Sequence, residues 1–227
     1  MRPETRSKYH AELENLTTEI AELGALAESA VRQSVDALVR RDRELAAKVI
    51  DEDDAIDARY LDIEKRILDL FALQTPVASD LRLVSAILHI NLHLERVGDQ
   101  AVNVAKIGLA TFDLPTSAVI LSHITEMGDV VCRMLHTAIE AFERRDLDLC
   151  MKLPAMDDPV DRLNRGMYTE VVKLAGDEPL LEWGIRMNVI ARQLERVGDN
   201  AVDIGEQVGF LLTGEFREFT DASHESP

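Results

Sequence analysis

Acidic side chains recur one helical turn apart at two places in the chain. Glu95 and Asp99 form one row, and Glu195, Asp199 and Asp203 form a longer one. Residues four apart lie on one face of a helix, and like charges at that spacing destabilise it by about 0.2–0.5 kcal/mol per pair. We therefore expect a cation to offset each row, either an arginine of a neighbouring helix or a bound metal ion.

Carboxylate oxygens at this spacing suit hard divalent or trivalent cations, so iron, Zn, Mn and Mg are the metals to consider. The alternative is an acidic helix face held by salt bridges between helices, and the residue pattern leaves both open. Arg96 and Arg196 follow the two glutamates directly, about 100° round the helix. They cannot neutralise their own rows, but they could reach a neighbouring helix.

Other acidic and histidine clusters are weaker candidates. One acidic set is interpreted as charges on the solvated side of a helix, and comprises Asp51, Asp53, Asp54 and Asp57 with counterparts Asp157, Asp158 and Asp161. His89 and His93 have a known metal-ligand spacing, but the second half of the chain carries Val189 and Gln193 there. The unduplicated histidine pair is therefore the less favoured site.

The carboxylate rows belong to an internal repeat. The sequence LERVGD occurs at 94–99 and again at 194–199, an offset of 100 residues. Upstream, Arg40-Arg41-Asp42 matches Arg144-Arg145-Asp146 at an offset of 104, so the second copy is four residues shorter. Such self-similarity indicates a tandem duplication. We divide the chain into a first repeat (1–111), a second repeat (112–213) and a polar tail (214–227) that we expect to be loose.

Each repeat reads as three long helices. Apolar residues of the first helix are spaced alternately three and four apart, which is typical of a helix and not of a strand. The next two helices are expected over about 43–73 and 80–109, with Ser79 as the N-cap of the latter. In the second repeat, the three helices are expected to begin near residues 116, 146 and 178. Pro159 is expected to start a helical turn. Short loops between long helices force antiparallel packing. The predicted fold is all-α, with two antiparallel three-helix bundles of spectrin-repeat-like helices.

Glycines inside the motif helices are interpreted as places of close helix approach, since each costs about 0.8–1.0 kcal/mol relative to alanine. Gly98 and Gly198 stand within the repeated motif, and Gly24 and Gly128 are the candidate partners.

Composition excludes several classes of function. Acidic residues outnumber basic ones 42 to 25, for a net charge of −17, which disfavours binding to nucleic acid or to an anionic membrane surface. No apolar stretch approaches the roughly 20 residues that span a bilayer, and the N-terminus lacks a signal core, so we expect a cytoplasmic protein. Cys132 and Cys150 lie in apolar helical patterns and are expected in the core.

Enzymatic motifs are missing from the sequence. It contains no phosphate-binding loop, nucleophile elbow or dinucleotide fingerprint, and no E-x-x-H pair of the kind that di-iron bundles use. We predict a protein that is not an enzyme.

The two three-helix units, each with an acidic row in an ERVGD context, resemble the PhoU family. The resemblance rests on ERVGDQAVN and ERVGDNAVD and covers nearly the whole chain; Asp80-Leu81-Arg82 also resembles the family's D-x-R segment. The second repeat departs there, with Glu178-Pro179-Leu180, and carries Asp203 where the first has Asn103.

The resemblance implies a cytoplasmic negative regulator of phosphate uptake and of the phosphate-starvation response. Such proteins are adaptors between the ATPase subunit of the phosphate ABC transporter (PstB-like) and a sensor histidine kinase (PhoR-like). It also implies a homodimer, with metal on the five acidic residues of the rows. Arg82, Arg96 and Arg196 are the candidate partner-binding residues. The competing hypotheses are a metal-storage protein and a metal-free helical scaffold.

Overall fold

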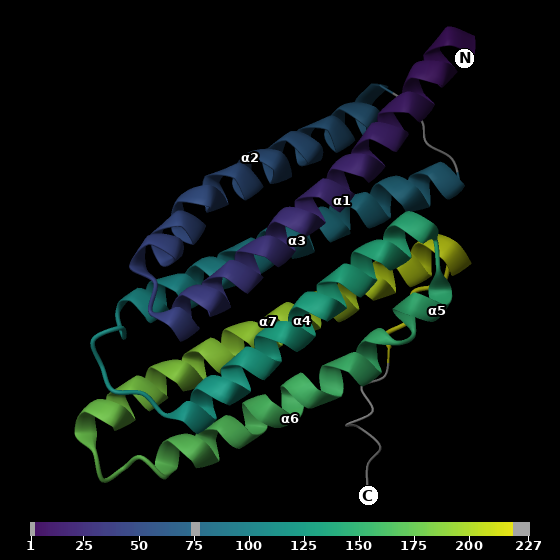
Figure 1. Ribbon diagram of the computed structural model, residues 1–227. Helices are drawn as coiled ribbons and strands as arrows, with labels where there is room; N and C mark the ends of the chain where they lie inside the picture. Colours follow the sequence, from purple (N-terminus) through teal and green to yellow (C-terminus); the bar gives the residue numbers. More distant parts are fainter. Residues whose placement is uncertain (1–2, 74–77, 220–227) are drawn as a thin grey trace, which may run out of the picture.

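The computed structural model describes residues 3–73 and 78–219, and it confirms the predicted all-α fold. In Figure 1 the helices lie along one another as two bundles placed side by side. The first bundle comprises α1 (Pro3–Arg40), α2 (Arg43–Leu73) and α3 (Ser79–Leu109). The second comprises α4 (Ala118–Arg144), α6 (Leu153–Val172) and α7 (Glu178–Thr213), with the single turn α5 (Leu147–Cys150) before α6.

The apolar spacing read from the sequence becomes the core of each bundle. In α1 the fully buried residues Leu16, Ile20, Leu23 and Ala27 lie three or four residues apart, on the side that faces the other helices. The core is aliphatic for most of its extent, and both cysteines are buried in it without a disulfide. Burial of aliphatic side chains in this way is the main stabilising term for such a bundle.

The turn that follows the first helix has the same structure in both repeats. Arg41 and Arg145 both adopt the left-handed conformation at φ 55°. The aspartate that follows each arginine accepts a hydrogen bond from a backbone N–H three residues on, at 2.9 Å for Asp42 and 3.2 Å for Asp146. This duplicated cap ends one helix and starts the next within two residues.

Three local predictions were wrong. The helix expected from Asp146 is divided into α5 and α6, because Pro154 has no N–H to continue the hydrogen-bond ladder from one to the other. Pro159 lies inside α6 and starts no turn. The N-cap of α3 is Ala78, at φ 44°, and no side chain caps that end.

The two bundles meet through α1 against α4 and α3 against α7. A Cβ added at Gly24 would lie 2.6 Å from Ile139, and one at Gly128 would lie 3.0 Å from Val35. These two contacts are equivalent under the 104-residue offset. The glycines therefore permit close approach of α1 and α4, as expected of their residue type, but they are not the partners of Gly98 and Gly198.

Polar side chains occupy the centre of the contact between α3 and α7. Asn200 Nδ2 donates to Gln100 Oε1 at 3.4 Å, and these residues are equivalents in the two repeats. A pseudo-two-fold axis therefore passes between them. His93 Nδ1 lies 2.8 Å from Asn200 Oδ1, and all three side chains are buried.

The beginning of the tail packs on the second bundle instead of extending into solvent. Phe219 lies partly buried against the core, and its N–H donates to Glu206 Oε1 at 2.7 Å. The remainder of the predicted tail lies outside the described residues. Within the described ranges, no helix combines the length and apolarity needed to cross a membrane.

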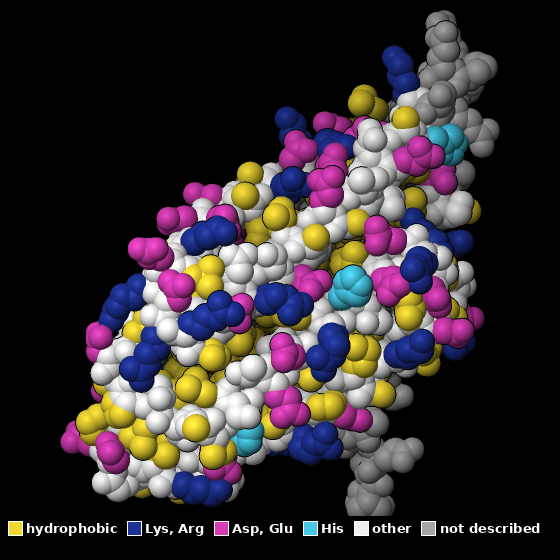
Figure 2. Space-filling model, in the orientation of Figure 1, with side chains coloured by type: hydrophobic (Ala, Val, Ile, Leu, Met, Phe, Trp, Pro, Cys, Tyr) yellow, Lys and Arg dark blue, Asp and Glu magenta, His cyan; other side chains and the backbone are white. Residues whose placement is uncertain are grey.

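The face of the molecule seen in Figure 2 mixes charges of both signs. Apolar side chains gather at its lower left, where α4 and α7 begin and α6 ends. Three exposed residues of these segments are apolar or aromatic, namely Val119, Tyr168 and Val172.

Candidate functional site

Each carboxylate row is met by a second pair of acids from the neighbouring helix. Asp53 and Asp57 of α2 interact electrostatically with Glu95 and Asp99 of α3. We name these four residues the first acid cluster. The row itself was predicted from the sequence, whereas its two partners had been interpreted as solvated charges. Asp57 is exposed, in agreement with that interpretation, but Asp53 is partly buried, so for Asp53 the interpretation was wrong.

The second repeat reproduces the arrangement. Asp161 of α6 interacts with Glu195 and Asp199 of α7, and Asp157 of α6 lies beside Gly198. The second acid cluster comprises Asp157, Asp161, Glu195, Asp199 and Asp203. The signal that could have revealed the partners was present in the sequence, because Asp53 and Asp57 recur as Asp157 and Asp161 at the same four-residue spacing.

A glycine in each acidic row leaves space for an aspartate of the neighbouring helix. A Cβ at Gly98 would lie 3.1 Å from Asp53 Oδ1, and a Cβ at Gly198 would overlap Asp157 Oδ1. The two glycines of the ERVGD motif therefore let a carboxylate of the adjacent helix approach the backbone between the row's glutamate and aspartate. Close packing was the predicted role, and here the packing partner is itself an acid.

Burial and mutual repulsion raise the pKa values of two carboxyl groups in each cluster. In the first cluster, desolvation and then Asp57 and Asp99 raise the pKa of Asp53 to about 6. Desolvation and then Asp99 also raise the pKa of Glu95. Each cluster thus holds partly desolvated acids that resist ionisation, and a cation would stabilise their charged forms.

The glutamate of the second cluster, Glu195, is more buried than Glu95 of the first. Glu195 is 7% exposed, and desolvation followed by Asp199 raises its pKa to about 7. Arg192 donates to Glu195 Oε1, while Glu195 Oε2 is buried and has no hydrogen-bond partner within the described part of the chain. The first repeat has Leu92 in place of Arg192. An arginine therefore forms an ion pair with the glutamate of the second row, whereas no such pair is present at Glu95 among the described residues.

Asp203 occupies an edge of its cluster and also contacts the other bundle. Its carboxylate Oδ2 lies 3.5 Å from His93 Nδ1. Asp203 also lines a cavity of about 340 Å³ with Asp157, Asp199 and Phe219. His93 of the first repeat thus approaches the row of the second repeat.

The donor set of both clusters fits a hard cation. All the donors are carboxylate oxygens, which Mg²⁺, Mn²⁺ and iron accept, and Glu195 Oε2 lacks a partner. Among the described residues no three His, Cys, Asp or Glu side chains converge closely enough to hold a metal as they stand. A metal would therefore require the carboxylates of a cluster to move closer together than they are here.

The three predicted partner-binding arginines have different surroundings. Arg82 Nε donates to the carbonyl of Leu211 at 3.4 Å, near the end of α7, so this side chain joins the two bundles. Arg96 and Arg196 are exposed, and neither forms an ion pair with a described residue. Their predicted pairing with a neighbouring helix does not occur, which leaves both guanidinium groups at the surface beside the acid clusters.

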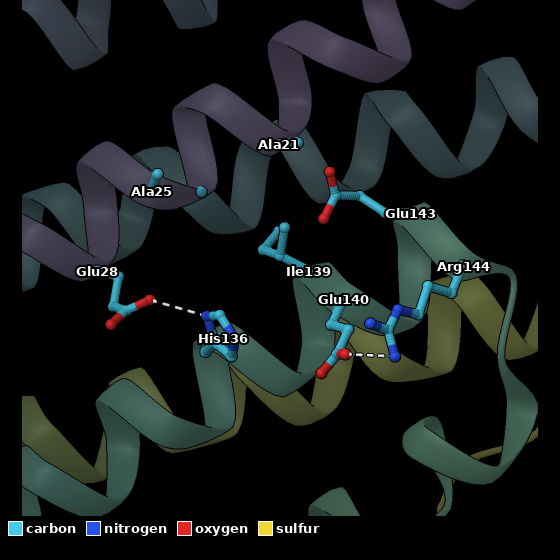
Figure 3. Close-up of a pocket in the computed structure, with 9 residues that line it drawn as sticks. Ala21, Ala25, Glu28, His136, Ile139, Glu140, Glu143 and Arg144 are labelled. Carbon is cyan, nitrogen blue, oxygen red and sulfur yellow. Dashed lines mark ion pairs between the residues drawn. The ribbon is translucent and has the colours of Figure 1, made fainter.

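A further cavity of about 420 Å³ lies between α1 and α4 (Figure 3). Two of its acidic side chains already have partners: Glu28 lies 3.6 Å from His136, and Glu140 pairs with Arg144 at 2.7 Å. Ile139 points into the space beside Gly24. This cavity results from close packing of two helices across the pseudo-two-fold axis.

The fold and the two clusters define a duplicated helical protein with paired, symmetry-related acidic sites. The family model described as "PhoU domain" matches residues 20–108 and 124–208. The chain belongs to the PhoU family. It is 33% identical over 216 residues to "Phosphate-specific transport system accessory protein PhoU homolog" of Caulobacter vibrioides, covering 95% of this chain and 94% of the relative. A protein of the same description from Clostridium acetobutylicum is 30% identical over 219 residues, covering 96% and 100%.

Solved structures of the family are close matches. The crystal structure of PhoU from Pseudomonas aeruginosa aligns with a TM-score of 0.87 at 32% identity, covering 91% of this chain and 100% of that one. The phosphate transport system regulatory protein PhoU from Streptococcus pneumoniae aligns with a TM-score of 0.85 at 28% identity, covering 92% and 99%. The paired three-helix bundles are thus the fold of the family.

Proposed function

We propose that this protein is an accessory regulator of a phosphate transport system. Support comes from its relatives, which are described as phosphate-specific transport system accessory proteins and match along almost their whole length. The role is regulatory and not enzymatic. No group in either cluster pairs a nucleophile with a base, and carboxylates alone leave cation binding and docking as their main chemistry.

The proposed mechanism is that of an adaptor. The protein contacts the ATPase subunit of the phosphate transporter and a sensor histidine kinase, restrains uptake and keeps the starvation response off when phosphate is abundant. The observation that carries the mechanism is the pair of equivalent acid clusters, each made of two helices. A cation at either cluster would join α2 to α3, or α6 to α7, and would fix the surface that a partner meets.

The cation would be held by carboxylates already named. Glu95 and Asp99 would hold it in the first cluster, and Glu195, Asp199 and Asp203 in the second, with Asp53 and Asp157 beside them. When bound, the ion supplies positive charge and neutralises the row. The protein's own residues provide the rest: Gly98 and Gly198 admit the opposing aspartates, and the exposed Arg96 and Arg196 lie at the rim.

A metal-free scaffold is the competing function, and one observation favours it. Arg192 already pairs with Glu195, so an arginine neutralises part of the second cluster without a metal. The scaffold predicts that alanine substitution of the acids changes stability and leaves partner binding unaffected.

The test uses a strain in which the five row residues, Glu95, Asp99, Glu195, Asp199 and Asp203, are replaced together by alanine. The adaptor predicts that repression of phosphate-responsive genes at high phosphate is lost, while the purified variant stays helical. A matched variant replaces the exposed acids Asp51, Asp129 and Glu178, which lie outside the clusters, and should repress normally. Unchanged repression in the five-site variant would contradict the adaptor mechanism.

A further inference from the structure

A cavity of about 480 Å³ lies between the two bundles, and no residue of either acid cluster lines it. The first bundle contributes α1 and the start of α3 to its lining, and the second contributes only Arg145, directly after α4. The lining is mixed in character and comprises His10, Leu13, Glu14, Thr17, Thr18, Asp80, Leu83 and Arg145.

Arg145 lines this cavity, and one of its donors is unsatisfied. Its Nη1 is buried and makes no hydrogen bond to any described residue. The guanidinium lies over the ring of Phe142, 4.7 Å from the centroid, which holds it in place. Buried donors in folded proteins are nearly always paired, so an unpaired donor indicates that a hydrogen-bond acceptor is missing. Burial also lowers the pKa of this arginine.

The internal repeat indicates what that partner is. Arg41 is the equivalent of Arg145 and has the same left-handed backbone. Its Nη2 donates to the carbonyl of Leu114 at 2.8 Å. Leu114 belongs to the non-helical segment 110–117 that joins the two bundles. At the first arginine, therefore, an irregular segment of the chain supplies a backbone carbonyl.

The same comparison explains why the Arg145 cavity is open. By the repeat offset the counterpart of Leu114 is His10, which lies within α1, so no irregular segment is present to fill the space. At the offset of 100 residues the counterpart of Leu83 is Trp183, a larger side chain that is 1% exposed in the second bundle. The smaller leucine leaves room beside Arg145 for an apolar side chain.

The charge of the cavity lining indicates which kind of ligand the cavity accepts. Glu14 and Asp80 stand opposite a single arginine, so the cavity disfavours phosphate and other free anions. A neutral backbone carbonyl satisfies the guanidinium without adding charge. We propose that the Arg145 cavity binds a short non-helical segment of a partner protein, which presents a carbonyl to Arg145 and an apolar side chain to Leu13 and Leu83. The site would serve the adaptor role proposed above, but binding can be measured independently of it.

The probe is a peptide with the sequence of residues 111–117, acetylated and amidated, carrying Asp113→Asn. The substitution is included because Asp113 pairs with Arg43 at 2.8 Å, whereas the equivalent of Arg43 is Leu147. The peptide is titrated into the full-length labelled protein, and the Nε–Hε signal of Arg145 is followed by NMR. We expect saturable shifts with a dissociation constant on the order of 1 mM.

Two variants test the location of the site. Arg145→Met removes the donor, and Leu83→Trp places the larger side chain of its counterpart Trp183 in the cavity lining; each should weaken binding at least about tenfold. Arg217→Met, at an exposed arginine of the tail, is the matched control and should bind like the wild type. Circular dichroism establishes that every variant is folded, and if Leu83→Trp does not fold, Arg145→Met decides.

Three results would overturn the proposal: no saturable shift up to about 10 mM peptide, equal binding by the wild type and Arg145→Met, or a saturable shift at Arg145 caused by inorganic phosphate and not by the peptide. The last result would make this an anion site. None of the three bears on the phosphate-regulation role, which the five-site acid variant tests separately.

Discussion

Asp157 occupies the space that a side chain at Gly198 would need. A Cβ at Gly198 would overlap the carboxylate oxygen Oδ1 of Asp157. Gly98 and Asp53 repeat the relationship in the first bundle, at 3.1 Å. A glycine in the middle of a long helix thus has a functional explanation, since it allows an acid of the next helix to join the row.

Gly198→Ala should destabilise the protein by about 1–3 kcal/mol, because the added methyl group displaces Asp157 and overpacks the contact between α6 and α7. Chemical denaturation measures the change. Gly166→Ala is the matched control: it lies in α6 with no atom within 4 Å of the added Cβ, so the higher helix propensity of alanine should stabilise by about 0.5–1 kcal/mol. Equal effects at both positions would contradict the packing explanation.

Glu195 should make stability fall as pH rises. Its folded pKa is raised from 4.5 to about 7, so the folded protein binds this proton more tightly than the unfolded chain does. The contribution is fully present below pH 4.5 and is lost as pH rises through about 7. Glu195→Gln removes this dependence, and its stability relative to the wild type should improve by about 1–2 kcal/mol between pH 5 and 8.

The measurement is urea unfolding of both proteins across that pH range without added metal. Glutamine keeps an acceptor for Arg192, so the comparison isolates the titrating proton. A constant difference between wild type and variant from pH 5 to 8 would show that Glu195 is ionised throughout.

His93 and Asn200 should be energetically coupled, because each supplies the buried hydrogen-bonding partner of the other, at 2.8 Å. Either alanine substitution leaves a buried polar group unpaired and should cost about 1–3 kcal/mol. A double-mutant cycle should give a coupling energy of about 1 kcal/mol. Additive effects would mean that the contact between α3 and α7 does not depend on this pair.

Phe219 should contribute to the stability of the second bundle. Phe219→Ala removes a partly buried ring that lies beside Gly205 and Gly209, and we expect a loss of about 1 kcal/mol. Phe216 stacks on Phe210 but is 73% exposed, so Phe216→Ala should change stability by less than about 0.5 kcal/mol. The thermal midpoints of the two variants provide the comparison, and a larger loss at Phe216 would be the contrary result.

The duplication, the helix bounds and the acidic rows could be predicted from the sequence because each is a local pattern. Period and capping residues fix a helix within a few positions, and a repeated hexapeptide is visible without a structure. Gly24 and Gly128 could likewise be assigned to close packing. Their partners, Ile139 and Val35, depend on how two bundles meet, which no local pattern contains.

The partners of the acidic rows could not be predicted from a local pattern either. A run of acids such as that around Asp53 is usually solvated, and only the packing of α2 on α3 turns one face of it toward Glu95. Phe219 is a second example: a single aromatic residue in a polar tail has no periodicity, and its binding place exists only once Gly205 and Gly209 leave a shallow surface on α7.

In the proposed mechanism, the acid clusters bind a metal ion that the adaptor function uses. The most direct test is elemental analysis of tag-free protein purified without chelator, beside a variant with alanine at Glu95, Asp99, Glu195 and Asp199. We predict bound iron, zinc, manganese or magnesium in the wild type and its loss in the folded variant. Equal metal content in the two proteins, or no metal in either when both are folded, would contradict the claim and favour the metal-free scaffold.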